Sequence, residues 1–91
     1  MTKKVDSSNN AWFVYIVRCD DGTLYTGITN DLERRCDQHN AGTASRYTRS
    51  RLPVVLVYQE TQGSRSLSLK RELEIKALSR KEKEALIDAA G

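Results

Sequence analysis

The first half of the chain places two apolar segments on either side of an acidic turn. Residues 12–19 form a nearly unbroken run of apolar, aromatic and β-branched residues, which is typical of a strand covered on both faces. Asp20, Asp21 and Gly22 interrupt this run, and residues 24–29 resume with strand-forming residues. The pattern therefore predicts a β-hairpin.

Two hairpin loops fit this pattern: a two-residue loop at Asp21 and Gly22, and a three-residue loop with Gly22 in the left-handed region. The choice matters because a one-residue shift of register moves every side chain to the opposite face. The three-residue loop places Tyr15 opposite Gly27 and puts Tyr25 on the same face, whereas the two-residue loop separates the tyrosines. We expect the three-residue loop, because a glycine inside a strand often marks the close approach of another group.

A helix is expected directly after the hairpin. Asn30 can cap it, Glu33 occupies the reciprocal capping-box position, and Gly42 can end it. Four residues at helical spacing form one stripe that should face the sheet: Leu32, Arg35, Cys36 and His39. An arginine and a histidine on an inward stripe need partners, because buried charge without pairing is costly. Arg34 points nearly the opposite way and is expected to lie in solvent.

The second half of the chain predicts one more strand and two more helices. Residues 54–58 are rich in β-branched residues and should form the third strand, with residues 59–64 as the connection that follows. Ser64 or Ser66 should cap a second helix that extends to Leu78. Ser79 and Glu82 form a capping box for a short third helix that ends near residue 89.

The resulting order, β-β-α-β-α-α, predicts an α+β fold with a small three-stranded antiparallel sheet flanked by helices. Residues 12–19 should be the central strand, because this segment is apolar on both faces. Residues 1–10 are polar and lack periodicity, so we expect a flexible N-terminal tail. Residues 11–91 should then form a single domain with one modest core, given 38% hydrophobic residues.

Length and cysteine usage exclude several classes of protein. No run approaches the ~20 apolar residues that cross a bilayer, and no apolar segment follows Lys3 and Lys4 as in a secretory signal. We therefore expect a cytoplasmic protein without membrane contact. Cys19 and Cys36 lack the spacing of a zinc site and should be two reduced, buried thiols.

Charge is distributed unevenly along the chain, although the net charge is only +3. No acidic residue lies between Asp37 and Glu60, and in this interval three arginines surround Tyr47: Arg46, Arg49 and Arg51. Arginines interleaved with an aromatic residue suit phosphate contact and base stacking. The alternative is a loop whose arginines are simply solvated.

The second predicted helix carries one carboxylate on an apolar edge. Glu72 follows Leu69 by three residues and precedes Ile75 by three, whereas Glu74 has basic neighbours at helical spacing and should be a solvated ion-pair partner. Glu72 is therefore the carboxylate that we expect to lie against the apolar side of the helix and to have a functional role. The alternative is an ordinary ion pair between Glu72 and Lys76, worth a few tenths of a kcal/mol.

Two tripeptides and three later residues resemble the GIY-YIG nuclease superfamily. Residues 13–15 (Phe-Val-Tyr) stand where the family has GIY, and residues 25–27 (Tyr-Thr-Gly) where it has YIG. Arg35 matches the family's helix arginine, His39 the polar residue one turn later, and Glu72 the metal-binding glutamate. The resemblance covers residues 12–87 and is greatest to small stand-alone members. The chain departs from the family at Phe13, which replaces a glycine, and has no asparagine after residue 40.

The resemblance implies a metal-dependent endonuclease that hydrolyses phosphodiester bonds with little sequence specificity. One Mg²⁺ or Mn²⁺ would bind Glu72, without an organic cofactor, and DNA is favoured over RNA as the partner. Arg35 would contact the scissile phosphate. The base would be Tyr25, with Tyr15 and His39 positioning it, although a free tyrosine has a pKa of ~10 and histidine, at ~6.5, is the easier base on that ground. Residues expected along the bound nucleic acid are Gly27, Arg46, Tyr47, Arg49, Arg51 and Lys76.

Two other functions fit the same sequence. The first is a nucleic-acid-binding module that keeps the fold and the basic face without turnover. The second is a small scaffold whose tyrosines pack on the core, since a fold alone does not settle function.

Overall fold

The three predicted strands form one antiparallel sheet. The structure, a computed structural model, describes residues 11–90; the predicted tail, residues 1–10, lies outside the described residues. The sheet order is β2-β1-β3, so the apolar segment supplies the central strand and the predicted α+β class is confirmed. In chain order the elements are β1 (Trp12–Arg18), β2 (Leu24–Thr29), α1 (Leu32–Asn40), α2 (Arg46–Arg49), β3 (Val55–Gln62), α3 (Arg65–Lys76) and α4 (Arg80–Ala90).

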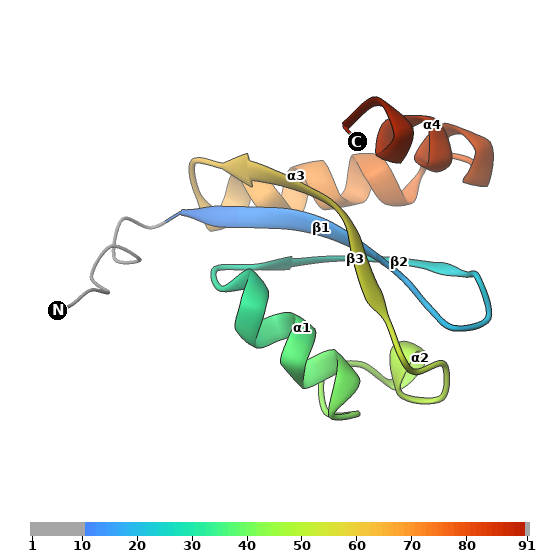
Figure 1. The fold of residues 1–91 in the computed structure, drawn as a ribbon. Coiled ribbons are helices and arrows are strands. Elements are labelled where there is room, and N and C mark those ends of the chain that lie inside the picture. Colours follow the sequence, from blue (N-terminus) through green and yellow to red (C-terminus); the bar gives the residue numbers. More distant parts are fainter. Residues whose placement is uncertain (1–10, 91) are drawn as a thin grey trace, which may run out of the picture.

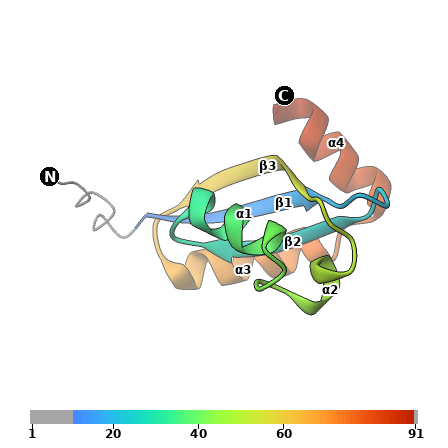
Figure 2. The same ribbon diagram turned by 60° about the horizontal axis from the view of Figure 1, so that its bottom comes forward.

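Helices cover both faces of the sheet (Figure 1). Helices α1 and α2 lie on one face, and α3 and α4 on the other; in Figure 2, α1 lies in front of the sheet and α3 behind it. Alternation along β1 sends Val14 and Ile16 into a core with Ile75 of α3 and Ile87 of α4. The opposite face buries a second cluster, formed by Tyr15, Val17, Cys19 and Val54. The central strand is therefore buried on both faces, as its composition predicted.

The hairpin between β1 and β2 has the expected three-residue loop. The amide of Cys19 donates to the carbonyl of Thr23 at 2.8 Å, and Gly22 has φ +86°, in the left-handed region that glycine adopts without strain. Tyr15 pairs with Gly27 across the two strands. The two candidate tyrosines consequently share the face covered by α1, as predicted.

The first helix begins one residue later than predicted. Its N-cap is Asp31, whose side chain accepts a hydrogen bond from the amide of Arg34 at 3.1 Å. The Thr29 hydroxyl accepts from the amide of Asp31 at 3.0 Å and so closes a turn across Asn30. This turn moves the cap from Asn30 to Asp31, and the predicted capping box with Glu33 is wrong.

Two features of the middle of the chain also differ from the prediction. The third strand continues to Gln62 instead of ending at Tyr58, because β1 keeps pairing with it as far as the Trp12–Gln62 pair. Polar residues at the end of β3 are held in place from α3, where Arg71 Nε donates to Glu60 Oε1 at 2.7 Å. The arginine-rich loop contains the one-turn helix α2, which begins after the cap Ser45.

The caps of the last two helices agree with the sequence. Ser64 caps α3 by accepting from the amide of Leu67 at 3.1 Å. Ser79 and Glu82 form the predicted capping box before α4, with hydrogen bonds of 2.8 and 3.1 Å. Within residues 11–90, none of the helices combines the length and the apolar content that crossing a membrane requires.

Candidate active site

A chain of hydrogen bonds connects β1, α1 and α2 below the sheet. The Tyr15 hydroxyl lies 2.8 Å from His39 Nε2, and His39 Nδ1 lies 2.8 Å from the Thr48 hydroxyl. The Tyr25 ring meets the imidazole edge-on, with 5.3 Å between ring centroids. His39 is 1% exposed and Tyr15 2% exposed, so the imidazole and the first phenol are held by packing as well as by hydrogen bonds. Tyr25 is half-buried.

Gly27 allows this arrangement. An atom at the Cβ position of residue 27 would lie 2.6 Å from the Tyr15 hydroxyl oxygen and 2.8 Å from its Cζ. The Tyr15 phenol therefore crosses the backbone of β2 where a side chain is missing. The prediction that this strand glycine marks the close approach of another group is confirmed.

Burial governs the protonation states of the two buried groups. Burial raises the pKa of Tyr15 far above its ordinary value; nearby Tyr25 and Glu72 raise it further, and the Arg35 charge opposes them. Burial, followed by the Arg35 charge, holds the pKa of His39 below its ordinary value. Tyr15 thus keeps its proton and His39 is neutral at neutral pH.

Arg35 brings a positive charge to the site that no carboxylate of the described residues neutralises. None of the ion pairs within residues 11–90 involves Arg35, and its buried Nε has no hydrogen-bond partner there. Arg35 lines a polar cavity of about 130 Å³ between the end of β2 and the start of α1, together with Thr29, Asn30, Asp31, Arg34 and Gln38. Arg34, expected to point into solvent, is exposed but shares this cavity. An anion is the natural ligand for such donors.

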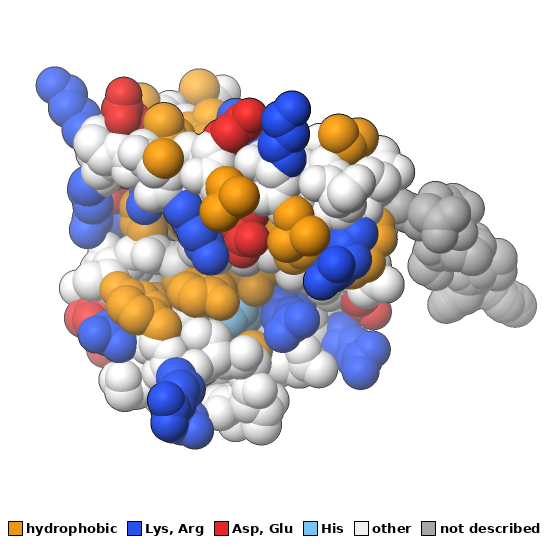
Figure 3. Space-filling view, turned by 180° about the vertical axis from the view of Figure 1, so that it is seen from behind, with side chains coloured by type: hydrophobic (Ala, Val, Ile, Leu, Met, Phe, Trp, Pro, Cys, Tyr) orange, Lys and Arg blue, Asp and Glu red, His pale blue; other side chains and the backbone are white. Residues whose placement is uncertain are grey.

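Glu72 approaches the site from the other layer of helices. Its side chain is 15% exposed, and its charge acts on the Tyr15 phenol. The expected alternative is also present, because Lys76 Nζ lies 3.3 Å from Glu72 Oε2. Glu74 points into solvent and pairs with Arg71 at 3.2 Å, as expected. Figure 3 shows the single histidine in a hollow between the two helical layers, with basic side chains around the hollow and an acidic one above the histidine.

Comparison with known proteins is consistent with this geometry. The family model for the GIY-YIG catalytic domain matches residues 11–85. This chain belongs to the GIY-YIG family. The family is one of nucleases, which act on nucleic acid.

Several relatives of this GIY-YIG chain are UPF0213 proteins. The UPF0213 protein DP2720 of Desulfotalea psychrophila is 52% identical over 89 residues, which cover 97% of this chain and 81% of that protein. The solution NMR structure of the UPF0213 protein BH0048 from Bacillus halodurans is 41% identical, with a TM-score of 0.58 over 89% of this chain and 86% of that one. The protein EF2693 from E. faecalis gives 37% identity and a TM-score of 0.59, over 87% and 84%. The similarity therefore extends over most of both chains.

The donor set of this GIY-YIG site suits one hard cation. Among the described residues, no group of three or more His, Cys, Asp or Glu side chains is placed to hold a metal. Glu72 is the carboxylate whose charge acts on the Tyr15 phenol, and one such ligand fits Mg²⁺ or Mn²⁺ because these ions keep several waters and take few protein ligands. Both cysteines are free thiols; Cys19 is buried as predicted, whereas Cys36 is only partly buried, and this burial raises the pKa of Cys36, so it stays protonated.

The arginine-rich segment of this GIY-YIG domain divides into two parts. Arg46 and Arg49 line an open hollow of about 440 Å³ together with residues 42–45. Arg51 is instead engaged internally: its Nε donates to Asp21 Oδ2 at 3.0 Å, and its guanidinium lies 4.0 Å from the centre of the Tyr47 ring. Arg46 and Arg49 thus form no ion pair within residues 11–90, whereas Arg51 is paired with Asp21 of the hairpin loop.

Tyr47 and Thr48 connect the same segment to the site. The Tyr47 ring stacks on that of Tyr25, with 6.0 Å between centroids, and remains 38% exposed beside the site. Thr48 is 1% exposed and bonds His39. Sequence reasoning missed Thr48, because only its place in the arginine-rich segment singled it out and the one-turn helix that turns it inward carried no periodic signal.

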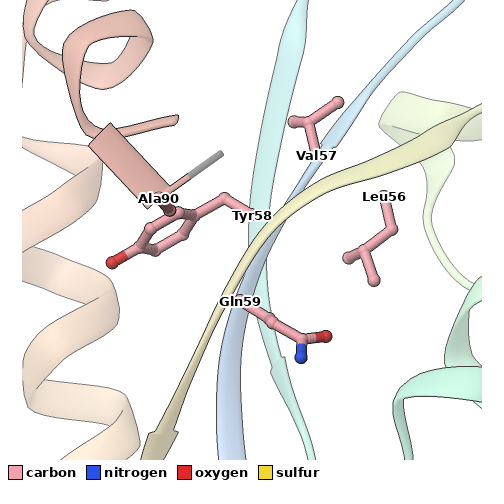
Figure 4. Close-up of a pocket in the computed structure, with 5 residues that line it drawn as sticks. All are labelled: Leu56, Val57, Tyr58, Gln59 and Ala90. Carbon is pink, nitrogen blue, oxygen red and sulfur yellow. The ribbon is translucent and has the colours of Figure 1, made fainter. Parts of the chain in front are cut away.

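A further hollow, of about 430 Å³, lies at the free edge of β3 and is lined by Leu56, Val57, Tyr58, Gln59 and Ala90. Figure 4 shows the Tyr58 ring directed toward the helices of the other layer. The lining holds no carboxylate, imidazole or cationic side chain. This hollow therefore lacks the imidazole and the charged groups found around His39.

Proposed function

We propose that this chain is a metal-dependent endonuclease that hydrolyses phosphodiester bonds in nucleic acid, with DNA favoured over RNA and with little sequence specificity. The observation that carries the proposal is the meeting of two phenols and a neutral imidazole beside an arginine whose charge no carboxylate neutralises among the described residues. A phosphodiester supplies the missing anion, and hydrolysis needs the proton transfers that such groups provide.

Arg35 binds the scissile phosphate in this proposal. Its planar guanidinium can donate two parallel hydrogen bonds to phosphate oxygens, and its charge favours the extra negative charge of the transition state. Glu72 would hold the divalent cation, and Lys76 would then release the carboxylate and turn toward the nucleic acid. When bound, that cation supplies charge stabilisation at the phosphoryl and leaving oxygens.

Tyr25 is the proposed base for the attacking water. His39 has both ring nitrogens engaged, by Tyr15 and by Thr48, and is buried, so it cannot reach a water directly. Tyr25 is half-buried at the wall of the hollow; after passing its own proton to solvent, its oxygen would accept the proton of the water as the water oxygen bonds to phosphorus, and the ester oxygen would leave and take a proton from solvent. Tyr15 keeps its proton, so it would position the reacting groups and would not deprotonate the water.

In this proposal the nucleic acid follows the hollow around His39 that Figure 3 shows. Arg46 and Arg49 would contact phosphates, because both line an open hollow and form no ion pair within residues 11–90. The space beside Gly27 is taken by the Tyr15 phenol, so Gly27 would shape the hollow and would not itself meet the nucleic acid in the way that the sequence predicts. Phosphate contacts position the backbone without selecting a base sequence.

One observation favours a second function, a nucleic-acid-binding module without turnover. The Glu72–Lys76 ion pair occupies the carboxylate that a cation needs. A protein in which this pair persisted would still present its arginines to phosphates and would bind nucleic acid without cutting it.

A cleavage panel distinguishes the two functions. The purified protein is incubated with labelled duplex, single-stranded and branched DNA and with RNA, in Mg²⁺, in Mn²⁺ and in chelator, and binding is measured on the same substrates. A nuclease cuts at least one substrate with metal and none with chelator. Salt-dependent binding without cleavage of any substrate would establish the binding module and refute the nuclease.

A further inference from the structure

The hydrogen-bond chain through His39 ends on a residue that the family resemblance does not assign. The Thr48 hydroxyl lies 2.8 Å from His39 Nδ1 and 3.4 Å from the carbonyl oxygen of Ser45. The Ser45 carbonyl oxygen can only accept, so it offers the Thr48 hydroxyl proton a position that leaves the hydroxyl oxygen free to accept the proton of His39 Nδ1. A neutral imidazole protonated on Nδ1 has a free lone pair on Nε2, which then accepts the Tyr15 O–H.

From this geometry we infer that Thr48 is a positioning residue that fixes the tautomer of His39 and, through it, the direction of the Tyr15 proton. The inference rests on the proposed nuclease function and adds to it. With its proton directed into the imidazole, the Tyr15 oxygen presents lone pairs, and no proton, to the hollow. In the other tautomer, Nε2 would donate to Tyr15, whose own proton would then point toward the reacting groups.

The placement of Thr48 connects this tautomer to the nucleic-acid-binding segment. Helix α2 is capped by the Ser45 side chain, which accepts from the amide of Tyr47 at 3.1 Å. Thr48 faces inward at 1% exposure, whereas its neighbour Arg49 is exposed and lines the arginine hollow. A single helical turn thus carries a proposed phosphate contact on its outer side and the tautomer-setting hydroxyl on its inner side.

The chain offers a direct test, because His39 is its single histidine. A two-bond ¹⁵N–¹H correlation spectrum therefore reports one imidazole and needs no assignment. In the wild-type protein at neutral pH we expect a protonated, pyrrole-type Nδ1 and an unprotonated, pyridine-type Nε2. The Nε2-protonated tautomer in the wild type would overturn the inference.

Three variants separate the hydroxyl from the shape of the side chain. Thr48→Val removes the hydroxyl at similar size and should lose the pure Nδ1-protonated signature, whereas Thr48→Ser keeps the hydroxyl and should retain it. Thr43→Val is the matched control, because the Thr43 hydroxyl is exposed and donates to the carbonyl of Gln38, away from the imidazole. An unchanged His39 spectrum in Thr48→Val would also overturn the inference. Thr48→Ser decides it if Thr48→Val does not fold, since a Nε2-protonated serine variant is incompatible with it.

Kinetics test the consequence for catalysis. On the substrate that the panel identifies, Thr48→Val should lower kcat ~10- to 100-fold, less than the loss of a whole general acid–base contribution, with KM unchanged and with Thr48→Ser restoring most of the rate. A changed tautomer with an unchanged kcat refutes the positioning role. If the wild type cuts nothing, the proposed function fails, and the NMR arm alone decides whether Thr48 sets the tautomer.

Discussion

Gly27 shows how one absent side chain holds the site together. Its Cα faces the Tyr15 phenol so closely that a methyl group there would lie 2.6 Å from the hydroxyl oxygen. The phenol also bonds His39, so any displacement of Tyr15 breaks the hydrogen-bond chain at its first member. A glycine and a histidine 12 residues apart in the sequence thus depend on the same tyrosine.

We predict that Gly27→Ala lowers the free energy of unfolding by ~1–3 kcal/mol, the usual range for overpacking. The variant should also lose most cleavage activity, because Tyr15 must move away from His39. Gly63→Ala is the control, since a Cβ there meets Leu67 Cδ1 at 3.6 Å, an ordinary contact. Urea denaturation measures the unfolding free energy of both variants. Equal stability of the Gly27→Ala and wild-type proteins would show that the phenol can move aside without destabilising the fold.

Protonation of His39 should make the folded state less stable in weak acid. The pKa of His39 is depressed by burial and by Arg35, so below the ordinary value of ~6.5 the unfolded chain binds a proton that the folded one resists. The stabilisation is therefore complete above pH ~6.5 and declines as the pH falls toward the depressed folded value. The unfolding free energy should fall between pH 7 and pH 5.5 in the wild type and fall less in His39→Gln. Identical pH profiles would contradict the depressed pKa.

At the scale of elements, the one-turn helix α2 organises the arginine-rich segment. It directs Thr48 to the imidazole and Tyr47 to Tyr25, and leaves Arg46 and Arg49 on an open hollow. Arg51 ties the segment back to the hairpin loop through Asp21. Arginines that are close in sequence consequently have different functions.

We predict that replacing both Arg46 and Arg49 by alanine weakens nucleic-acid binding and reduces the slope of log K against log salt. Each lost phosphate contact should lower the slope by ~0.7–0.9, depending on strandedness. Arg51→Ala should mainly lower stability, because its guanidinium is already engaged. The control, Lys81→Ala with Lys83→Ala, removes the same charge from α4. If the control changes the slope as much as the arginine pair does, the binding face has been misplaced.

The sequence predicts elements well where a residue type constrains the backbone, and poorly where tertiary contacts decide. The hairpin register followed from Gly22 and Gly27, whose positions allow few alternatives. The sequence does not place the N-cap of α1 correctly because Asn30 and Asp31 cap equally well, and the Thr29 hydroxyl decides between them. The sequence does not indicate the end of β3 because Glu60 and its polar neighbours are held by Arg71 from another element.

At the scale of the whole molecule, the site draws its residues from the two layers of helices, which cover opposite faces of the sheet. The tyrosines and His39 belong to the layer of α1, and Glu72 to the layer of α3. The sequence indicated which residues have the chemistry, since each stands on a predicted buried stripe or beside an unusual glycine. It did not indicate Thr48 or the internal role of Arg51, because both depend on how α2 packs against the other elements.

An ion pair helps to attach the layer of α3 and α4 to the sheet. The contribution of this pair to the stability of the protein depends on pH. Both carboxylate oxygens of Glu84 on α4 accept from Arg18 on β1 at 2.9 Å, and hydrogen bonds from Arg18 and Arg80 hold the pKa of Glu84 at about 2. This contribution is complete above the ordinary value of 4.5 and is lost as the pH falls toward 2.

We therefore predict that Glu84→Gln reduces the pH dependence of the unfolding free energy between pH 4.5 and about 2. Asp88→Asn is the control, because it removes a carboxylate from the same helix that forms no ion pair within residues 11–90. Chemical denaturation across this range measures the slope. If the Asp88 variant alters the slope and the Glu84 variant does not, the ion pair contributes nothing in solution.

The measurement that tests the proposed nuclease most directly is metal-dependent cleavage by Glu72→Gln, with Glu74→Gln as the matched control on the same helix. Glutamine keeps the size and nearly the helix propensity of glutamate but removes the charge that a hard cation requires. We predict that Glu72→Gln binds nucleic acid at least as tightly as the wild type and loses cleavage by orders of magnitude, because the cation's charge stabilisation is worth several kcal/mol. Glu74→Gln should cut normally, since Glu74 points into solvent and pairs with Arg71. Equal cleavage by Glu72→Gln and the wild type would contradict the metal assignment and the mechanism built on it.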